Sequence, residues 1–357
     1  MMKGTPTSPC NDIAYIIDPR FPGGTSAAVV SELRVVAALG EVKVHAITSK
    51  MFGQKSVSPK IRAVLRELDL QMVWDAPQIN ADLVIWHNPS FLKFQDSFAS
   101  RIMCRHLIVV THENFYRPGQ VEAYDVGHCH ELIDKSALAL RKSIAPISPY
   151  NRETVLDWFQ LGGIPQGWDV LQEDWFNICD FDYHAPTEAP RDRRGRHSRP
   201  GMEKFPNPRD MMACFPAHAE SNVILGADLF INSPTPIAHW DLHPFGGLDI
   251  SGYFEMIDFM VYFTAPTWRE SFGRVLAEAI AAGKVVISDP GTAATFGGGV
   301  IGAAPKDVDA IIGQFLGSPE QYQEHVTMAQ SLLRSFAPDK FRDHFLTTIG
   351  QQIGVRA

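Results

Sequence analysis

Short apolar runs alternate with amphipathic stretches along most of the 357-residue chain. Residues 13–17 form an apolar run, residues 26–39 repeat apolar side chains at helical spacing, and residues 42–47 form the next run. Thr25 is a residue type that caps helices, and Gly40 is one that ends them. Strand, helix and strand in this order predict parallel sheets covered by helices. Further strands are predicted at residues 83–86, 107–111 and 144–147, and helices at 58–69, 126–141 and 149–159.

The alternation is interrupted once and then resumes. Residues 162–197 carry paired glycines, several prolines and a run of arginines, which indicates a domain junction. A chain of this length usually needs two hydrophobic cores. We therefore predict two α/β domains, residues 1–165 and 166–340, followed by a helical segment, residues 341–357. In the second domain, strands are predicted at residues 222–225, 237–240, 259–263 and 285–288, and helices at 208–214, 250–257 and 271–282.

Composition and charge narrow the function classes. The formal net charge of −8 argues against general nucleic-acid binding, which favours basic domains. The five cysteines are odd in number and none stands at C-x-x-C spacing, so neither a disulfide framework nor a zinc site is expected. Residues 1–11 lack the apolar core of a signal peptide, and no apolar run approaches the roughly 20 residues that cross a bilayer. We expect a cytoplasmic protein.

The loop after the strand at residues 259–263 is the most informative. Ligands of open parallel sheets bind beyond the carboxyl ends of the strands, and this loop leads into the predicted helix at 271–282. Phe272 and Gly273 would then lie in the first helical turn, whose unpaired N–H groups attract anions such as a pyrophosphate. Glu270 and Glu278 would grip the hydroxyls of a sugar or ribose. A capping pair on an ordinary amphipathic helix fits the same spacing.

A run of basic residues lies at the start of the second domain. Most arginines of residues 191–199 are expected in a solvated loop. Arg196 and Lys204 follow Gly195 and are placed to reach a diphosphate, one with a planar fork and the other with a point charge.

Two loops of the first domain also follow strands. Gly23 and Gly24 come directly before a helix, where a glycine turn lets backbone N–H groups approach a phosphate or sugar. A tight turn with no ligand is the alternative. His112 ends a strand at the edge where catalytic groups gather, although a buried structural histidine fits equally. His87 is placed similarly, and we assign it a structural role.

These motifs together resemble those of retaining GT-B glycosyltransferases, most closely family four. Glu270 and Glu278 resemble the E-x7-E motif of that family. The segment from Gly195 to Ser198, with Lys204 downstream, is similar to its Gly-Arg-x-Ser and Lys segment, although five residues separate Ser198 from Lys204, more than is common. Pro22-Gly23-Gly24 resembles its N-terminal glycine loop, His112 its N-domain histidine, and Ile147-Ser148-Pro149-Tyr150-Asn151 its segment before the linker.

The resemblance implies two Rossmann-like, doubly wound domains facing a central cleft, with the helical tail crossing back onto the first domain. Arg196 and Lys204 would neutralise the diphosphate, Glu270 would hold the donor sugar, and Glu278 the ribose. Gly23 and Gly24 would face the phosphate, and His112 would lie beside the transferred sugar. The remaining donor-binding residues would be Ser198, Ser271, Phe272, Gly273 and Arg274.

The implied reaction transfers a sugar from a nucleotide-diphosphate sugar with retention of configuration, without a cofactor or a metal. UDP is favoured over GDP, and the acceptor would be a saccharide or lipid-linked saccharide in cell-surface polysaccharide or glycoconjugate synthesis. Peripheral membrane contact is compatible with such an acceptor. Asp180-Phe181-Asp182 is similar to the D-x-D of metal-dependent glycosyltransferases, but it lies in the predicted interdomain segment and is assigned no metal.

Three other functions fit parts of the sequence. A nucleotide-sugar epimerase on the same fold would bind the same donor without an acceptor. A non-catalytic nucleotide-sugar-binding protein is a second alternative, and a dinucleotide oxidoreductase is a third. The oxidoreductase is disfavoured because the G-x-G-x-x-G match at residues 297–302 lacks the required strand before it and helix after it, and is predicted to be a turn.

Overall fold

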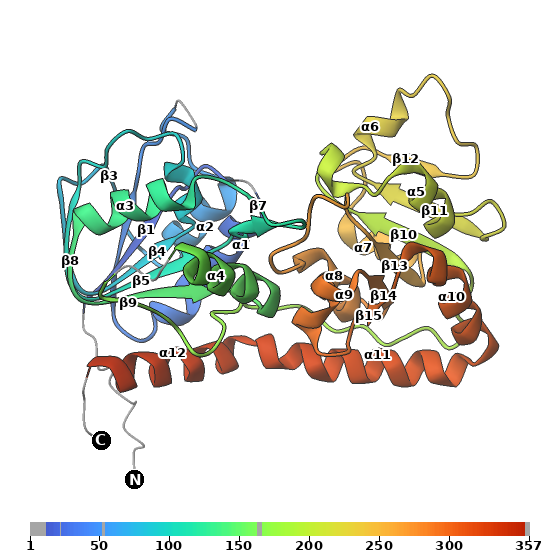
Figure 1. The fold of residues 1–357 in the computed structure, drawn as a ribbon. Coiled ribbons are helices and arrows are strands. Elements are labelled where there is room, and N and C mark those ends of the chain that lie inside the picture. Colours follow the sequence, from blue (N-terminus) through green and yellow to red (C-terminus); the bar gives the residue numbers. More distant parts are fainter. Residues whose placement is uncertain (1–11, 22, 52–53, 163–165, 354–357) are drawn as a thin grey trace, which may run out of the picture. The chain divides into compact units, whose positions relative to one another are not determined.

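The computed structural model describes residues 12–21, 23–51, 54–162 and 166–353, so Pro22 of the glycine loop lies outside the described residues. The described chain packs into two compact units (Figure 1). Unit 1 contains the residues up to Tyr116, Gln120–Asp180 and the residues from Phe336 onward, whereas unit 2 contains Arg117–Gly119 and Phe181–Ser335. The domain limits given above, after residues 165 and 340, stay predictions.

Unit 1 is built on a seven-stranded sheet of order β3-β2-β1-β4-β5-β8-β9, in which neighbouring strands run parallel. The strands are β1 (Asp12–Ile17), β2 (Glu41–Ala46), β3 (Met72–Trp74), β4 (Gln78–His87), β5 (Arg101–Thr111), β8 (Ala137–Pro146) and β9 (Trp168–Val170). The helices are α1 (Gly24–Val36), α2 (Pro59–Glu67), α3 (Val126–Ser136), α4 (Pro149–Gly162) and α12 (Pro338–Ile353). Two short strands, β6 (Tyr116–Arg117) and β7 (Val121–Glu122), pair separately.

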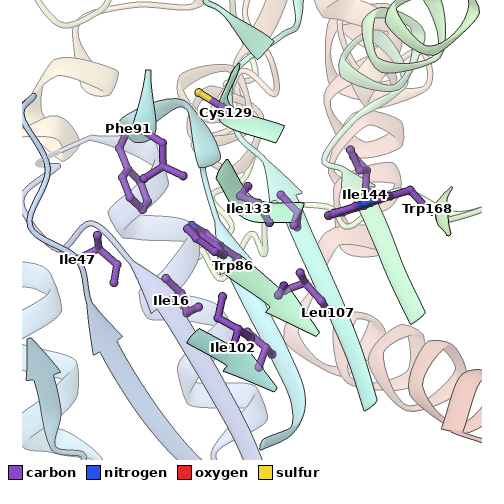
Figure 2. Close-up of a cluster of buried hydrophobic side chains, with 14 of the residues drawn as sticks. Ile16, Ile47, Trp86, Phe91, Ile102, Leu107, Cys129, Ile133, Ile144 and Trp168 are labelled. Atoms are coloured by element: carbon purple, nitrogen blue, oxygen red, sulfur yellow. The ribbon is translucent and has the colours of Figure 1, made fainter. Parts of the chain in front are cut away.

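The core of unit 1 lies against this sheet (Figure 2). Ile16 of β1, Trp86 of β4 and Leu107 of β5 are buried side by side on neighbouring strands. Ile144 and Trp168 continue the same layer across β8 and β9. Burial of contiguous apolar side chains is the main force that holds helices to a sheet.

Unit 2 contains a six-stranded parallel sheet of order β12-β11-β10-β13-β14-β15. Its strands are β10 (Arg193–His197), β11 (Ser221–Leu225), β12 (Asp241–His243), β13 (Phe259–Tyr262), β14 (Val285–Ser288) and β15 (Ile301–Gly302). Its helices are α5 (Pro208–Cys214), α6 (Asp228–Ile231), α7 (Ile250–Glu255), α8 (Arg274–Ala281), α9 (Pro290–Ala293), α10 (Val308–Gly317) and α11 (Pro319–Leu333). Within each sheet, the carboxyl ends of the parallel strands lie at the same edge, and ligands of such sheets bind at that edge.

The expectation of a solvated arginine loop is wrong for its central part. Residues 193–197 form β10, an interior strand of the second sheet. Arg194 is buried, and its guanidinium donates hydrogen bonds to Asp192, Asp309 and the carbonyl of Cys214. Buried charges persist in a core only when they are paired in this way.

Several predicted boundaries are also corrected. The helix of residues 126–141 ends at Ser136, and residues 137–141 belong to β8, where Leu138 and Leu140 alternate with less exposed neighbours as in a strand. The predicted strand at 237–240 lies instead at β12. Thr25 lies inside α1 rather than capping it, and α1 ends at Val36 instead of reaching Gly40. Within the described residues, no helix is long and apolar enough to span a membrane.

Candidate functional site

Two side chains of unit 2 donate hydrogen bonds to one carboxylate oxygen of a third. Lys204 ends a short 3-10 turn (Met202–Lys204), Tyr262 ends β13, and Glu270 lies in the loop between β13 and α8. The Lys204 Nζ donates to Glu270 Oε1 over 2.6 Å, and the Tyr262 hydroxyl donates to the same oxygen over 2.6 Å. Within the described residues, Glu270 Oε2 has no hydrogen bond, and the Glu270 side chain is 17% exposed. This second oxygen is therefore the one able to accept a ligand hydroxyl.

The electrostatics of this cluster keep Glu270 ionised and Tyr262 neutral. Burial acts to raise the pKa of Glu270, but the positive charge of Lys204 and the two hydrogen bonds outweigh it, so the pKa is lowered. The pKa of Tyr262 is raised well above its ordinary value by burial and by the nearby carboxylate. The cluster thus combines a cation, an anion and a neutral donor at the carboxyl end of β13.

Arg196 lies in the interior of β10 and is fully buried. Its guanidinium donates to the carbonyl oxygens of Phe263, over 2.9 Å, and of Lys204. It also packs over the rings of Phe205 and Tyr262, with its central carbon 4.2 and 5.0 Å from the ring centres. Arg196 therefore ties the backbone of Lys204 to the end of β13, and its contact with a diphosphate stays a prediction.

The start of α8 differs from the prediction. The helix begins at Arg274, and Gly273 precedes it with a φ of 88°, a left-handed conformation that does not continue into a helix. Because α8 begins after both residues, neither Phe272 nor Gly273 lies in its first turn. Phe272 is instead buried and packs edge-on against Phe296. The first-turn N–H groups belong to the residues from Arg274 onward.

Glu278 lies one turn into α8 and accepts a hydrogen bond from Arg274 Nε over 3.2 Å. This i,i+4 ion pair lies on one face of α8, and the contact of Glu278 with a ribose stays a prediction. Ser271 lies between Glu270 and Phe272 in the same loop. Ser198 follows β10, and its buried hydroxyl has no hydrogen-bond partner among the described residues, which leaves it as a candidate donor to a ligand.

The glycine loop of unit 1 opens α1. Gly23 caps the helix without a side-chain hydrogen bond, Gly24 is its first residue, and the first turn contains no acidic side chain. Both glycines are exposed, and a Cβ on either would meet no atom within 4 Å. The preceding loop is anchored by a buried ion pair between Arg20 and Asp18, 2.6 Å apart. The N-terminal end of α1 therefore presents exposed backbone N–H groups next to a loop that contains a buried ion pair. Such an end of a helix favours anions.

His112 directly follows β5 and is half-buried. Its Nε2 lies 2.9 Å from Nδ1 of His87, the last residue of β4. Burial, with a smaller contribution from His87, lowers the pKa of His112 well below its ordinary value. His112 is thus a neutral imidazole near neutral pH, and its place beside a transferred sugar stays a prediction.

Neither Glu32 nor Tyr262 is predicted as a functional residue from the sequence. Glu32 lies on the buried face of α1, between Ala28 and Val36 in the apolar repeat. A single carboxylate that interrupts an apolar helical face was the available signal, because buried charges are rarely retained without a partner. For Tyr262 we find no such signal, since a tyrosine at the end of an apolar strand is common in cores.

No protein-family model and no curated protein matches the sequence. Solved structures do match. Anabaena HepE bound to UDP-glucose has a TM-score of 0.63 at 15% identity, over 95% of this chain and 99% of that chain. Sucrose-phosphate synthase from Thermosynechococcus elongatus has a TM-score of 0.57 at 13% identity, over 96% of this chain and 99% of that chain. Both are GT-B glycosyltransferases, and the similarity confirms that this chain has the GT-B fold of two parallel-sheet α/β domains.

Proposed function

We propose that this chain is a metal-independent, retaining glycosyltransferase that uses a nucleotide-diphosphate sugar, with UDP favoured over GDP. The observation that carries the proposal is the Glu270 carboxylate, which is fixed by Lys204 and Tyr262 through one oxygen and keeps the other for a ligand. The binding of UDP-glucose by Anabaena HepE, which shares the fold, supports the choice of donor. The acceptor is proposed to be a saccharide or lipid-linked saccharide of cell-surface polysaccharide synthesis.

The residues of each unit fit separate parts of this reaction. Cleavage of a sugar–phosphate bond leaves negative charge on the diphosphate, and fixed cations and helix N-termini stabilise such charge. Lys204 supplies the cation in unit 2, and the open end of α1 supplies N–H groups in unit 1. Glu270 Oε2 would accept a hydroxyl of the donor sugar. The leaving phosphate would take the proton of the acceptor hydroxyl, so no carboxylate needs to act as a covalent nucleophile.

The substitution Glu270→Gln tests this assignment. It keeps the side-chain volume but removes the charge that pairs with Lys204 and the strong acceptor for a sugar hydroxyl. We expect kcat/KM for sugar transfer to fall about 10²–10³-fold, the scale on which one transition-state hydrogen bond is lost. The measurement is transfer of labelled sugar from UDP- and GDP-sugars to a panel of saccharide acceptors.

Glu324→Gln is the matched control, because Glu324 is an exposed glutamate of α11 in the same unit. It should leave kcat/KM within about twofold. Full activity in Glu270→Gln would contradict the assignment of Glu270 to the donor-sugar site. Release of a free epimer without an acceptor would instead establish the epimerase, and donor binding with no turnover would indicate a non-catalytic binding protein.

A further inference from the structure

Glu32 of α1 is a buried carboxylate that the proposed reaction does not use. Only 4% of its side chain is exposed, and no lysine or arginine is paired with it among the described residues. The Tyr15 hydroxyl donates to its Oε1 over 2.9 Å, and Trp175 Nε1 donates to its Oε2 over 2.9 Å. An indole nitrogen can only donate, so the carboxylate is held in place as a hydrogen-bond acceptor.

The same carboxylate faces a histidine. His87 Nε2 lies 3.4 Å from Glu32 Oε1, is buried, and has no hydrogen-bond partner among the described residues. The His87 ring is also fixed in orientation, because it stacks on Tyr15 with a centroid distance of 5.6 Å and an interplanar angle of 9°. A negative oxygen repels a ring lone pair and attracts a ring N–H. In neutral His87 the hydrogen therefore belongs on Nε2, and the lone pair on Nδ1.

That lone pair points to His112. His87 Nδ1 and His112 Nε2 are 2.9 Å apart, so one of the two nitrogens must carry the hydrogen between them. With the His87 hydrogen on Nε2, the shared hydrogen comes from His112 Nε2. The neutral ring of His112 then carries its lone pair on Nδ1, and His87 is its sole hydrogen-bond partner among the described residues.

We propose that Glu32 and His87 are positioning residues that fix His112 in its Nε2–H tautomer, so that His112 Nδ1 accepts a hydrogen bond from a ligand hydroxyl. The inference rests on the proposed function only for the identity of that hydroxyl, which would belong to the transferred sugar. The chain of contacts itself lies entirely within unit 1. Because each link depends on the one before, a change of charge at Glu32 alters which nitrogen of His112 carries hydrogen.

The tautomer is measured directly by long-range 1H–15N correlation spectra of the full-length protein, with His112→Gln to assign the signals. We expect a protonated Nε2 and an unprotonated Nδ1 near pH 7.5. Glu32→Gln presents an amide in place of the carboxylate, and we expect it to shift His112 toward the Nδ1–H form. An Nδ1–H tautomer or an imidazolium in the wild-type protein would overturn the proposal. This readout requires no activity, so it fails or succeeds independently of the proposed function.

Kinetics test the consequence. Glu32→Gln should lower kcat for sugar transfer about tenfold or more, as expected for a misplaced hydrogen bond, and change the donor KM by less than about twofold. His87→Asn places an amide oxygen near the position of Nδ1, so the acceptor for His112 no longer depends on Glu32. Adding Glu32→Gln to His87→Asn should then cause no further loss of kcat. If the two substitutions instead lowered kcat independently, so that their fold losses multiplied, the proposed dependence of His112 on Glu32 through His87 would be overturned.

Ser143→Ala is the matched control for stability. Ser143 shares a buried hydrogen bond of 2.9 Å with His106, on neighbouring strands of the same sheet and away from His112. We expect it to destabilise unit 1 to a similar extent but to leave kcat and the His112 spectrum unchanged. If Ser143→Ala reproduced the loss of kcat, Glu32 would have a merely structural role.

Discussion

At the scale of single residues, Glu270 is subject to two opposing effects. Burial disfavours its charge, whereas Lys204 and Tyr262 favour the charge through an ion pair and two hydrogen bonds to one oxygen. The second effect prevails and lowers the pKa of Glu270. A carboxylate whose charge depends on one lysine is also sensitive to a ligand anion, because a bound diphosphate would compete for the same ammonium group.

This balance predicts a pH-dependent stability. The pKa of Glu270 in the folded protein lies below its ordinary value of 4.5. The carboxylate therefore binds a proton more readily in the unfolded chain than in the folded protein. The stability that the charge contributes is present above about pH 4.5 and is lost as the pH falls through the lowered pKa. We expect the difference in unfolding free energy between the wild-type protein and Glu270→Gln to shrink on acidification, measured by urea denaturation at a series of pH values. A difference that grows in acid would contradict the lowered pKa.

At the scale of elements, a glycine lies at the start of α1 and another directly before α8, and the two meet different demands. Gly273 has a φ of 88°, and the fold requires a glycine there. Gly24 is the first helical residue of α1, has open space around it, and has no left-handed φ. The fold of unit 1 therefore does not require a glycine at position 24, and the proposed approach of a phosphate to this residue stays a prediction.

Gly24→Ala and Gly273→Ala separate these two demands. Gly24→Ala should leave the free energy of unfolding unchanged or raise it by up to about 1 kcal/mol, because alanine favours helix. It should also raise the donor KM about tenfold, since a methyl group would stand in the way of the phosphates. Gly273→Ala should lower the free energy of unfolding by about 1–2 kcal/mol. Thermal unfolding and initial-rate kinetics measure the two effects, and an unchanged donor KM in Gly24→Ala would mean that no phosphate approaches α1.

The elements also show where the sequence was sufficient. Strands made of apolar runs, such as β1 and β14, were predicted closely because consecutive apolar residues indicate a buried strand. β10 was not predicted, because the partner that makes Arg194 tolerable in a core, Asp309, is 115 positions away. The pairing of Glu32 with Trp175, 143 positions apart, was equally out of reach of any local pattern.

The candidate site was predicted in part for the same reason. Glu270 and Lys204 were named separately, but the hydrogen bond that joins them depends on the fold of unit 2. The predicted start of the helix at residue 271 was wrong. Serine is a common capping residue, but Gly273 has a left-handed φ, so α8 begins only at Arg274. Local preference and backbone geometry disagreed there, and geometry prevailed.

At the scale of the whole molecule, unit 1 is assembled from segments on both sides of unit 2 in the sequence. α12 packs against α1 and β5, and its Phe341, Phe345 and Ile349 are fully buried. Trp175 meets Phe341 and Phe345 edge-on, with ring centroids 5.3 and 5.9 Å apart. The core of unit 2 forms a separate cluster around Phe259 and Tyr322.

Two large-to-small substitutions test the separateness of these cores. Phe345→Ala should lower the free energy of unfolding of unit 1 by about 3–5 kcal/mol, the usual loss for a buried phenylalanine. Hydrogen exchange should then accelerate in β1 and α1 while β13 and β14 keep their protection. Phe259→Ala should give the opposite pattern. Uniform acceleration across both units in either variant would show that they unfold as one.

The course of synthesis follows from the position of α12. A ribosome makes every residue from Phe181 to Ser335 before it makes the helix that covers α1. Every residue of the unit 2 core cluster, from Phe205 to Val326, is therefore synthesised before the helix that packs against α1 and Trp175. The unit whose first strand emerges earlier is the one that is completed later.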